Sequence, residues 1–283
     1  MRKWKTSLLA PALFLFIASP VAAEDSESPS SRETDHLSIR WVEGVSAEAV
    51  EAVAKQGEVF YDAIATLLGE ELPRRIPILL GGPAESPDRT QRSHPHVDSF
   101  GRIQLFRYGG RDVSYLSPLA HEMVHVFRFK RRRQADWFFE EGFAEFVALT
   151  VDSSLSGFPW YDTPVEIAAG QWIASDADLP LEKLREEHRA LNLPCKAQSY
   201  ALRSSFFRYL GNEYGKEAIL EMAGKESAGD LADYRSILKK DFSELESEWR
   251  AWLLATYRSI DNVEVLAKRY REETPIQYMP VCN

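Results

Sequence analysis

An H-E-x-x-H motif at residues 121–125 is the feature that most constrains how this chain can fold. Residues four apart lie one above the other on a helix, so His121 and His125 can direct their ring nitrogens at one ion. Glu122 is offset by about 100° and can reach a water on that ion without binding the ion itself. Because the surrounding residues are mostly apolar, the segment predicts a buried helix with two metal ligands and one general base.

A second helix is required, because a catalytic zinc site uses three protein ligands and keeps one position open. Residues 137–145, Trp-Phe-Phe-Glu-Glu-Gly-Phe-Ala-Glu, supply the candidates. Glu141 and Glu145 share a helix face, and Gly142 is small enough to let another helix approach closely. We expect Glu141 to be the third ligand and Glu145 to hold the free ring N–H of a ligating histidine. Two surface histidines on an ordinary helix are the alternative.

The residues before the motif alternate between apolar and polar side chains. This pattern predicts strands over residues 37–42, 76–80 and 102–108, with a helix that follows an N-cap at Ser46. The segment 81–101 is rich in Pro, Asp and Ser and is expected to be a long loop, a kind of segment that is usually functional inside a compact domain.

From Ser117 onward the pattern is helical almost to the end. Ser117 and Pro118 look like the N-cap and first-turn proline of the motif helix. A few strands followed by many helices indicate an α+β fold, with a small mixed sheet packed against a mainly helical body. The expected helices cover residues 117–131, 138–151, 198–212, 215–224, 229–240 and 243–258.

The N-terminus has the order of an export signal: basic residues, an apolar run, and small residues ending at Ala23. Eleven apolar residues cover only about 16 Å as a helix, so cleavage after Ala23 is favoured over a retained membrane anchor. Residues 24–36 contain no apolar side chain and indicate a flexible leader, which leaves residues 37–283 as a single domain. We therefore expect an exported, soluble product without a stable membrane span.

The charge balance limits the partners. The chain of 283 residues carries 34 Lys and Arg against 43 Asp and Glu, a net charge of −9 that becomes −12 without the three basic residues of the signal. This balance excludes a basic nucleic-acid-binding protein. Residues 128–133 nevertheless hold five cations. Cations suit the end of a helix, and an anionic partner is the alternative.

Three further features of the sequence could carry chemistry. Cys195 and Cys282 are expected to form a disulfide in an oxidising compartment, with two buried thiols as the alternative. The segment His94-Pro95-His96 is interpreted as a solvated loop and not as a second metal site. The aromatic residues 158–161 are expected to pack under a loop, although they could line a substrate cleft.

These residues resemble the gluzincin metallopeptidases of the MA-like group, which carry H-E-x-x-H followed by a Trp/Phe-x-x-Glu-Gly-x-Ala-Glu helix, matched here over residues 138–145. The likeness continues through a Tyr-rich helix at 200–210 and a Leu-Glu-x-Glu-Trp-x-x-Trp-Leu run at 245–253. It implies a zincin-type fold whose edge strand, here 102–108, lies beside the motif helix. It also implies one Zn²⁺ per chain and a peptide or protein substrate.

The resemblance further implies that Tyr200 stabilises the oxyanion of the reaction. The chain departs from the common pattern just after it, because Leu202 and Arg203 replace a small polar pair. Arg203 is therefore an alternative cation for the oxyanion or for a substrate carboxylate, and a core tyrosine without a catalytic role is another reading of Tyr200. Two other functions stay open: a zinc-stabilised cell-envelope binding or scaffold module with latent or no peptidase activity, and a metallohydrolase of a non-peptide acyl substrate.

Overall fold

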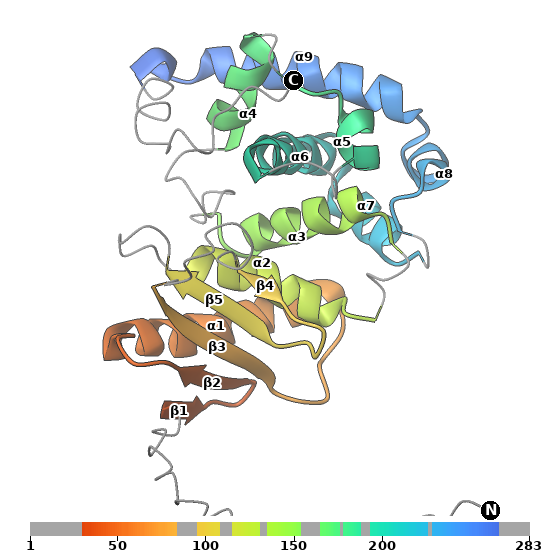
Figure 1. The fold of residues 1–283 in the computed structure, drawn as a ribbon. Coiled ribbons are helices and arrows are strands. Elements are labelled where there is room, and N and C mark those ends of the chain that lie inside the picture. The colour runs from red at the N-terminus through yellow and green to blue at the C-terminus, as the bar shows by residue number, and fades with distance from the viewer. Residues whose placement is uncertain are drawn as a thin grey trace, which may run out of the picture.

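The computed structural model describes residues 30–83, 95–107, 115–130, 135–153, 165–175, 178–187, 193–225 and 228–265. Within these ranges a small mixed sheet forms one end of the molecule and a helical body forms the other (Figure 1). The predicted α+β fold is confirmed. Outside the described residues lie the predicted export signal, His94, the aromatic run 158–161 and Cys282, together with the side chain of Cys195.

The sheet has a parallel centre and antiparallel edges. Strands β2, β3 and β5 run parallel to one another, β1 pairs with β2 in the antiparallel sense, and β4 pairs with β5 in the same way. In spatial order the strands are β1 (Ser30–Glu33), β2 (Leu37–Trp41), β3 (Ile76–Pro83), β5 (Ile103–Arg107) and β4 (His96–Val97).

The ordered fold begins earlier than the sequence predicts. Ser30 lies opposite Trp41 and Glu33 opposite Ser38, so part of the segment 24–36 is a strand and not a flexible leader. All four side chains of β1 are exposed. The strand is added to the sheet through its backbone, and its residues carry no apolar alternation by which it could be recognised.

The strand β5 is not the edge of the sheet, contrary to what the resemblance implies. The short strand β4 covers it, with His96 opposite Gln104 and Val97 opposite Ile103. The expected loop over residues 81–101 therefore contains a strand. The carboxylate of Asp98 fixes the following turn by accepting hydrogen bonds from backbone N–H groups two and four residues later.

Helices α1 (Ala47–Leu68) and α2 (Leu116–Phe127) cover one face of the sheet, which presents buried residues such as Ile39, Ile78 and Leu105 to them. Ser46 caps α1 as predicted. The predicted cap at Ser117 is wrong, because α2 begins at Leu116. Tyr115 precedes it in a helical conformation, and its hydroxyl donates a hydrogen bond to Gly81 O at 3.0 Å, which ties the start of α2 to the sheet.

Helix α3 joins the two halves of the molecule, because it packs on α2 on one side and on α6 on the other (Figure 1). Helices α4 and α5 were not predicted. Seven of the ten residues of α4 are buried, and the helix packs against α6 and α9, so only a narrow polar face is left to give a helical period. The body comprises α3 (Trp137–Val151), α4 (Val165–Ala174), α5 (Leu181–Glu187), α6 (Leu193–Tyr214), α7 (Lys216–Ala223), α8 (Leu231–Asp233), a π-helical segment (Tyr234–Leu238) and α9 (Phe242–Ser259).

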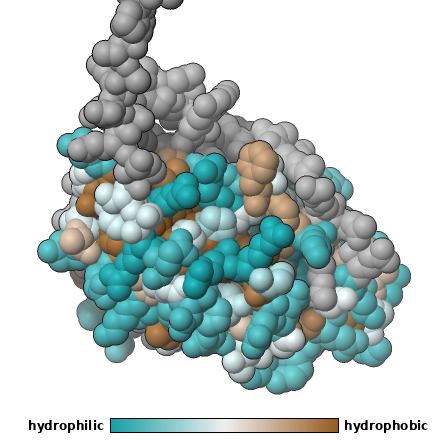
Figure 2. Space-filling model, turned by 90° about the horizontal axis from the view of Figure 1, so that it is seen from below, coloured by the Kyte–Doolittle hydropathy of each residue, from teal (hydrophilic) through white to brown (hydrophobic). Residues whose placement is uncertain are grey.

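The surface of the sheet end is mainly polar. Figure 2, which views the molecule from below, shows hydrophilic side chains with hydrophobic residues visible between them. Among the described helices, none combines the length and the apolar character that crossing a bilayer requires.

Candidate metal centre

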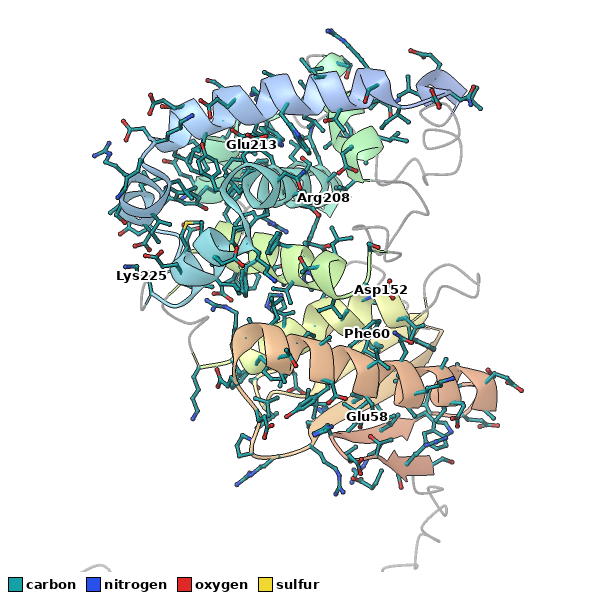
Figure 3. All side chains as sticks on the ribbon, turned by 180° about the vertical axis from the view of Figure 1, so that it is seen from behind. Glu58, Phe60, Asp152, Arg208, Glu213 and Lys225 are labelled. Carbon is teal, nitrogen blue, oxygen red and sulfur yellow. The ribbon has the colours of Figure 1, made fainter. Side chains whose placement is uncertain are left out.

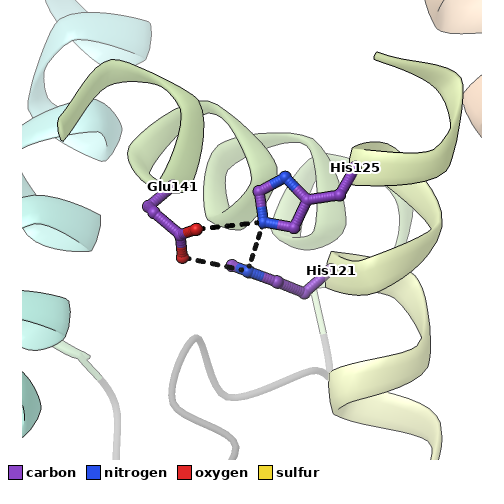
Figure 4. Close-up of side chains that lie close together, drawn as sticks. All are labelled: His121, His125 and Glu141. Atoms are coloured by element: carbon purple, nitrogen blue, oxygen red, sulfur yellow. Dashed lines mark hydrogen bonds and ion pairs between the residues drawn. The ribbon is translucent and has the colours of Figure 1, made fainter. Parts of the chain in front are cut away.

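The three predicted ligands meet where α2 and α3 contact each other (Figure 4). The Nε2 atoms of His121 and His125 lie 3.1 Å apart. One carboxylate oxygen of Glu141 lies 3.4 Å from the first of these nitrogens, and the other lies 3.3 Å from the second. Two imidazole nitrogens and one carboxylate therefore converge from two helices on a single point.

The spacing of these atoms is close enough for one ion to be shared, since one ligand atom from each residue lies within 4.8 Å of the others. Ligand bonds of about 2.0–2.1 Å with tetrahedral angles separate neighbouring ligand atoms by about 3.3 Å. The two histidine nitrogens lie 3.1 Å apart, close to this value, and each of them contacts a different oxygen of the Glu141 carboxylate. His121 and His125 are only 7% and 3% exposed, so the alternative of two surface histidines is wrong. The buried group of His121, His125 and Glu141 could hold a metal ion.

Local sequence explains why the two helices carry this cluster. The opposite side of α2 is apolar and is buried against the rest of the core, with Leu119, Met123 and Val124 fully enclosed. On α3, a Cβ atom added at Gly142 would lie 2.3 Å from the ring of Phe207. The predicted close approach at Gly142 is thus present, and α6 is the helix that makes it.

The cluster carries an excess of negative charge. Glu122, Glu141 and Glu145 are all buried, and among the described residues the buried cation beside them is Arg203, whose Nη2 lies 3.8 Å from Glu141 Oε2. This one arginine does not balance three ionised carboxylates. Because uncompensated charge is costly in the interior, a cation between these groups would be favoured.

The side chain of Glu145 lies behind the first histidine, with its Oε1 3.0 Å from His121 Nδ1. Burial lowers the pKa of His121, but the carboxylates of Glu145 and Glu141 outweigh it, and the pKa lies well above 6.5. Burial conversely raises the pKa of Glu141, but His125 and His121 outweigh it and hold that pKa well below 4.5. The same attraction favours any cation placed between these groups.

Glu122 is buried next to the ligands, and burial raises its pKa above the ordinary 4.5. The carboxylate of Glu141 raises the pKa of Glu122 further. His121, His125 and His96 act in the opposite direction and lower it. The net result is a raised pKa, which makes the Glu122 carboxylate a stronger base.

The electrostatic effect of His96 on Glu122 identifies a neighbour of the site that sequence reasoning missed. His96 lies on β4, which packs against α2, and its ring stacks on Phe106 with centroids 6.1 Å apart. The interpretation of His96 as part of a solvated loop is wrong. A two-residue strand is too short for an alternating pattern, so the sequence contains no periodic signal for it.

Helix α6 brings Tyr200 and Arg203 to the same cluster. The rings of Tyr200 and His121 have centroids 6.4 Å apart, and the Arg203 guanidinium lies 4.4 Å above the Tyr200 ring. Burial and the charge of Glu141 raise the pKa of Tyr200 well above 10, although Arg203 opposes this. Arg203 is fully buried behind Glu141, a position better suited to supporting that ligand than to meeting a substrate.

The basic run begins at the end of α2, where Arg128 is the C-cap residue. Arg128 is 4% exposed and is paired with Glu140, so its charge is not available to an anionic partner at the surface. Lys130 is exposed. Residues 131–133 lie outside the described residues.

The sequence was compared with protein-family models and with curated proteins. No family model matches the chain, and no curated protein matches it significantly. Function is therefore inferred from the geometry of the α2–α3 cluster and from the motif that builds it.

Proposed function

We propose that this protein is an exported zinc-dependent hydrolase of the gluzincin type that cleaves peptide bonds. The observation that carries the proposal is the buried convergence of His121 Nε2 and His125 Nε2, 3.1 Å apart, on the Glu141 carboxylate, whose two oxygens lie 3.4 and 3.3 Å from them. Two imidazoles and one carboxylate are a donor set that suits zinc and leaves a fourth position for water or substrate. Export is proposed from the residues before Ala23.

Each residue of the cluster has a chemical task in this proposal. His121, His125 and Glu141 would hold Zn²⁺, which lowers the pKa of water and polarises the scissile carbonyl. Glu122 takes the proton of the attacking water and passes it to the leaving amine.

Two kinds of support surround these steps. Glu145 fixes the ring orientation of His121. Tyr200 donates a hydrogen bond to the oxyanion that develops on the substrate, while Arg203 holds Glu141 in place.

The test compares Glu122→Gln with the wild-type protein. The variant should keep one zinc per chain and lose hydrolysis of a peptide library by about 10²-fold or more, since the acid–base step is removed and the ligands are not. Cleavage is read by mass spectrometry with and without a chelator. Glu58→Gln, the same substitution on a carboxylate at the sheet end, is the matched control and should cleave as the wild type does.

Other outcomes separate the rival functions. A wild-type protein that binds zinc, loses stability on chelation and cleaves no peptide would support a zinc-stabilised binding or scaffold module. Cleavage of simple esters without cleavage of peptides would support a hydrolase of non-peptide acyl groups. Full activity of Glu122→Gln would overturn the proposed mechanism.

A further inference from the structure

A buried ion pair closes one end of the α2–α3 contact. Arg128 Nε donates to both carboxylate oxygens of Glu140, at 2.9 and 3.0 Å, and Arg128 Nη2 donates to Oε1 as well. The two residues are 4% and 0% exposed. Arg128 follows the last residue of α2, and Glu140 directly precedes Glu141 in α3, so the pair is adjacent to the metal cluster in both helices.

The arginine also reaches a third helix. Its Nη1 donates to Ala223 O at 2.8 Å, at the end of α7, and its guanidinium lies 4.8 Å above the ring of Phe143. The donors of this side chain are thus directed at fixed acceptors on α3 and α7. A fork of planar donors can satisfy this set of partners, whereas a single ammonium cannot.

The pair and the metal cluster form one antiparallel series of contacts. Arg128 meets Glu140, His125 meets Glu141, and His121 meets both Glu141 and Glu145. Residue numbers rise along α2 while they fall along α3. Because each helix is internally rigid, fixing the first contact fixes how far α3 can slide along α2, and a slip of one turn would be about 5.4 Å.

Net stability is a weak explanation for such a pair. Removing two charges from water costs about as much as their attraction returns, and apolar side chains of similar volume often serve as well or better. What an ion pair adds is a defined register, that is, a fixed position of one helix along the other. A metal site depends on register, because ligand distances must agree with the ideal values to within about 0.2 Å.

We propose that Arg128 and Glu140 are positioning residues of the metal centre. They hold Glu141 opposite the two histidines before the ion arrives, so that zinc binds to a preformed set of ligands. This inference rests on the proposed function in taking His121, His125 and Glu141 as the ligands.

The test measures zinc affinity by competition with a chromophoric chelator, on wild-type protein, Arg128→Lys and Glu140→Gln. Each variant should bind zinc about 10- to 100-fold more weakly, the range seen when groups that orient metal ligands are lost. The visible spectrum of the Co²⁺-substituted protein provides a second readout, since its bands depend on ligand geometry. They should shift in both variants.

The control is Arg208→Lys. Arg208 on α6 pairs with the buried Glu166 of α4 at 2.9 Å, in the helical body (Figure 3). It is thus an arginine–glutamate pair that contacts no proposed ligand, although its arginine side chain, 39% exposed, is less buried than that of Arg128. Its zinc affinity should stay within about twofold of the wild type, and its cobalt spectrum should not move. Circular dichroism before each titration establishes that the variants are folded. If Arg128→Lys does not fold, Glu140→Gln alone tests the inference.

Two results would overturn the inference. If a folded variant binds zinc within twofold of the wild type and its cobalt spectrum is unchanged, the pair only joins helices. If the wild type itself binds no zinc, the proposed function fails together with this assignment, and that failure is visible before any variant is compared.

Discussion

Within the part of the chain that the structure describes, histidines contact glutamates in two places, and these differ in kind. At the sheet end, His36 Nδ1 lies 2.6 Å from Glu58 Oε2, with 38% and 24% of the two side chains exposed. Between α2 and α3, His121 and His125 contact Glu141 with 9%, 4% and 4% of the side chains exposed. Figure 3 shows Glu58 on α1, close to the strands.

The difference lies in what surrounds each carboxylate. Glu58 accepts hydrogen bonds from the Thr34 hydroxyl and from the His36 backbone N–H, the latter at 2.9 Å, in addition to its contact with the His36 ring. Its lone pairs are therefore directed at donors of the protein. At the other cluster two imidazole nitrogens and a carboxylate face one another in a buried space. A metal site is recognised by such convergence and not by a histidine beside a glutamate.

Removing a proposed ligand should give the largest difference in zinc affinity between the two clusters. In His125→Ala the zinc affinity should fall by about 10³-fold or more, because one of three protein ligands is lost from a site worth about 10 kcal/mol or more. His36→Ala should leave the affinity unchanged. Metal content after dialysis, measured by mass spectrometry, checks both. Equal zinc content in the two variants would show that the α2–α3 cluster is not the metal site.

The grouping of His121, His125 and Glu141 could be predicted from the sequence because helical spacing directs most of it. His121 and His125 are one turn apart, and Glu141 lies on the apolar helix that follows, so no long-range information was needed to group them. The α+β class followed similarly from the change of hydrophobic period along the chain.

The missed features have in common that they depend on distant partners. β1 is held by backbone pairing, α4 is mostly buried, and His96 belongs to a strand of two residues. The partners of Arg128 could not be predicted, because Glu140 and Ala223 O, which neutralise and orient it, lie 12 and 95 residues further along the chain. Local patterns contain no record of such contacts.

A smaller effect on zinc affinity is expected at Glu145, which lies behind the proposed ligand His121. Glu145→Gln should weaken zinc binding by about 10- to 100-fold, because an amide orients His121 less firmly than a carboxylate and adds no negative charge. The chelator competition used for the ligands measures it. Glu58→Gln should leave zinc affinity unchanged, so equal affinities in the two glutamine variants would remove Glu145 from the centre.

Close helix packing supports the α2–α3 cluster and can be tested at Gly142. A methyl group there would meet the ring of Phe207 at 2.3 Å, so Gly142→Ala should cost about 1–2 kcal/mol in urea unfolding and also weaken zinc binding. Gly211→Ala, which meets Phe146 at 2.4 Å across the same pair of helices, is the matched control. It should lose similar stability and keep its zinc affinity. A loss of zinc affinity in both would mean that general loosening is the cause.

The smallest effect concerns the histidine–glutamate contact at the sheet end. Partial burial raises the pKa of Glu58, but hydrogen bonds from Thr34 and His36 and the charge of His36 outweigh it, and the pKa lies below its ordinary 4.5. A carboxylate with a lowered pKa stabilises the fold above its unfolded pKa, and that contribution is lost as the pH falls through the folded value.

Glu58→Gln should therefore lower the free energy of unfolding at pH 7 by about 1 kcal/mol or less, because the contact is partly exposed and screened. The difference from the wild type should shrink below about pH 4.5, where the wild-type carboxyl takes up a proton. Urea unfolding at pH 7 and pH 3 measures it, with Glu51→Gln as a control on the same helix whose carboxylate is more exposed. A difference that persists unchanged at pH 3 would mean that packing, and not charge, holds β1 and β2 to α1.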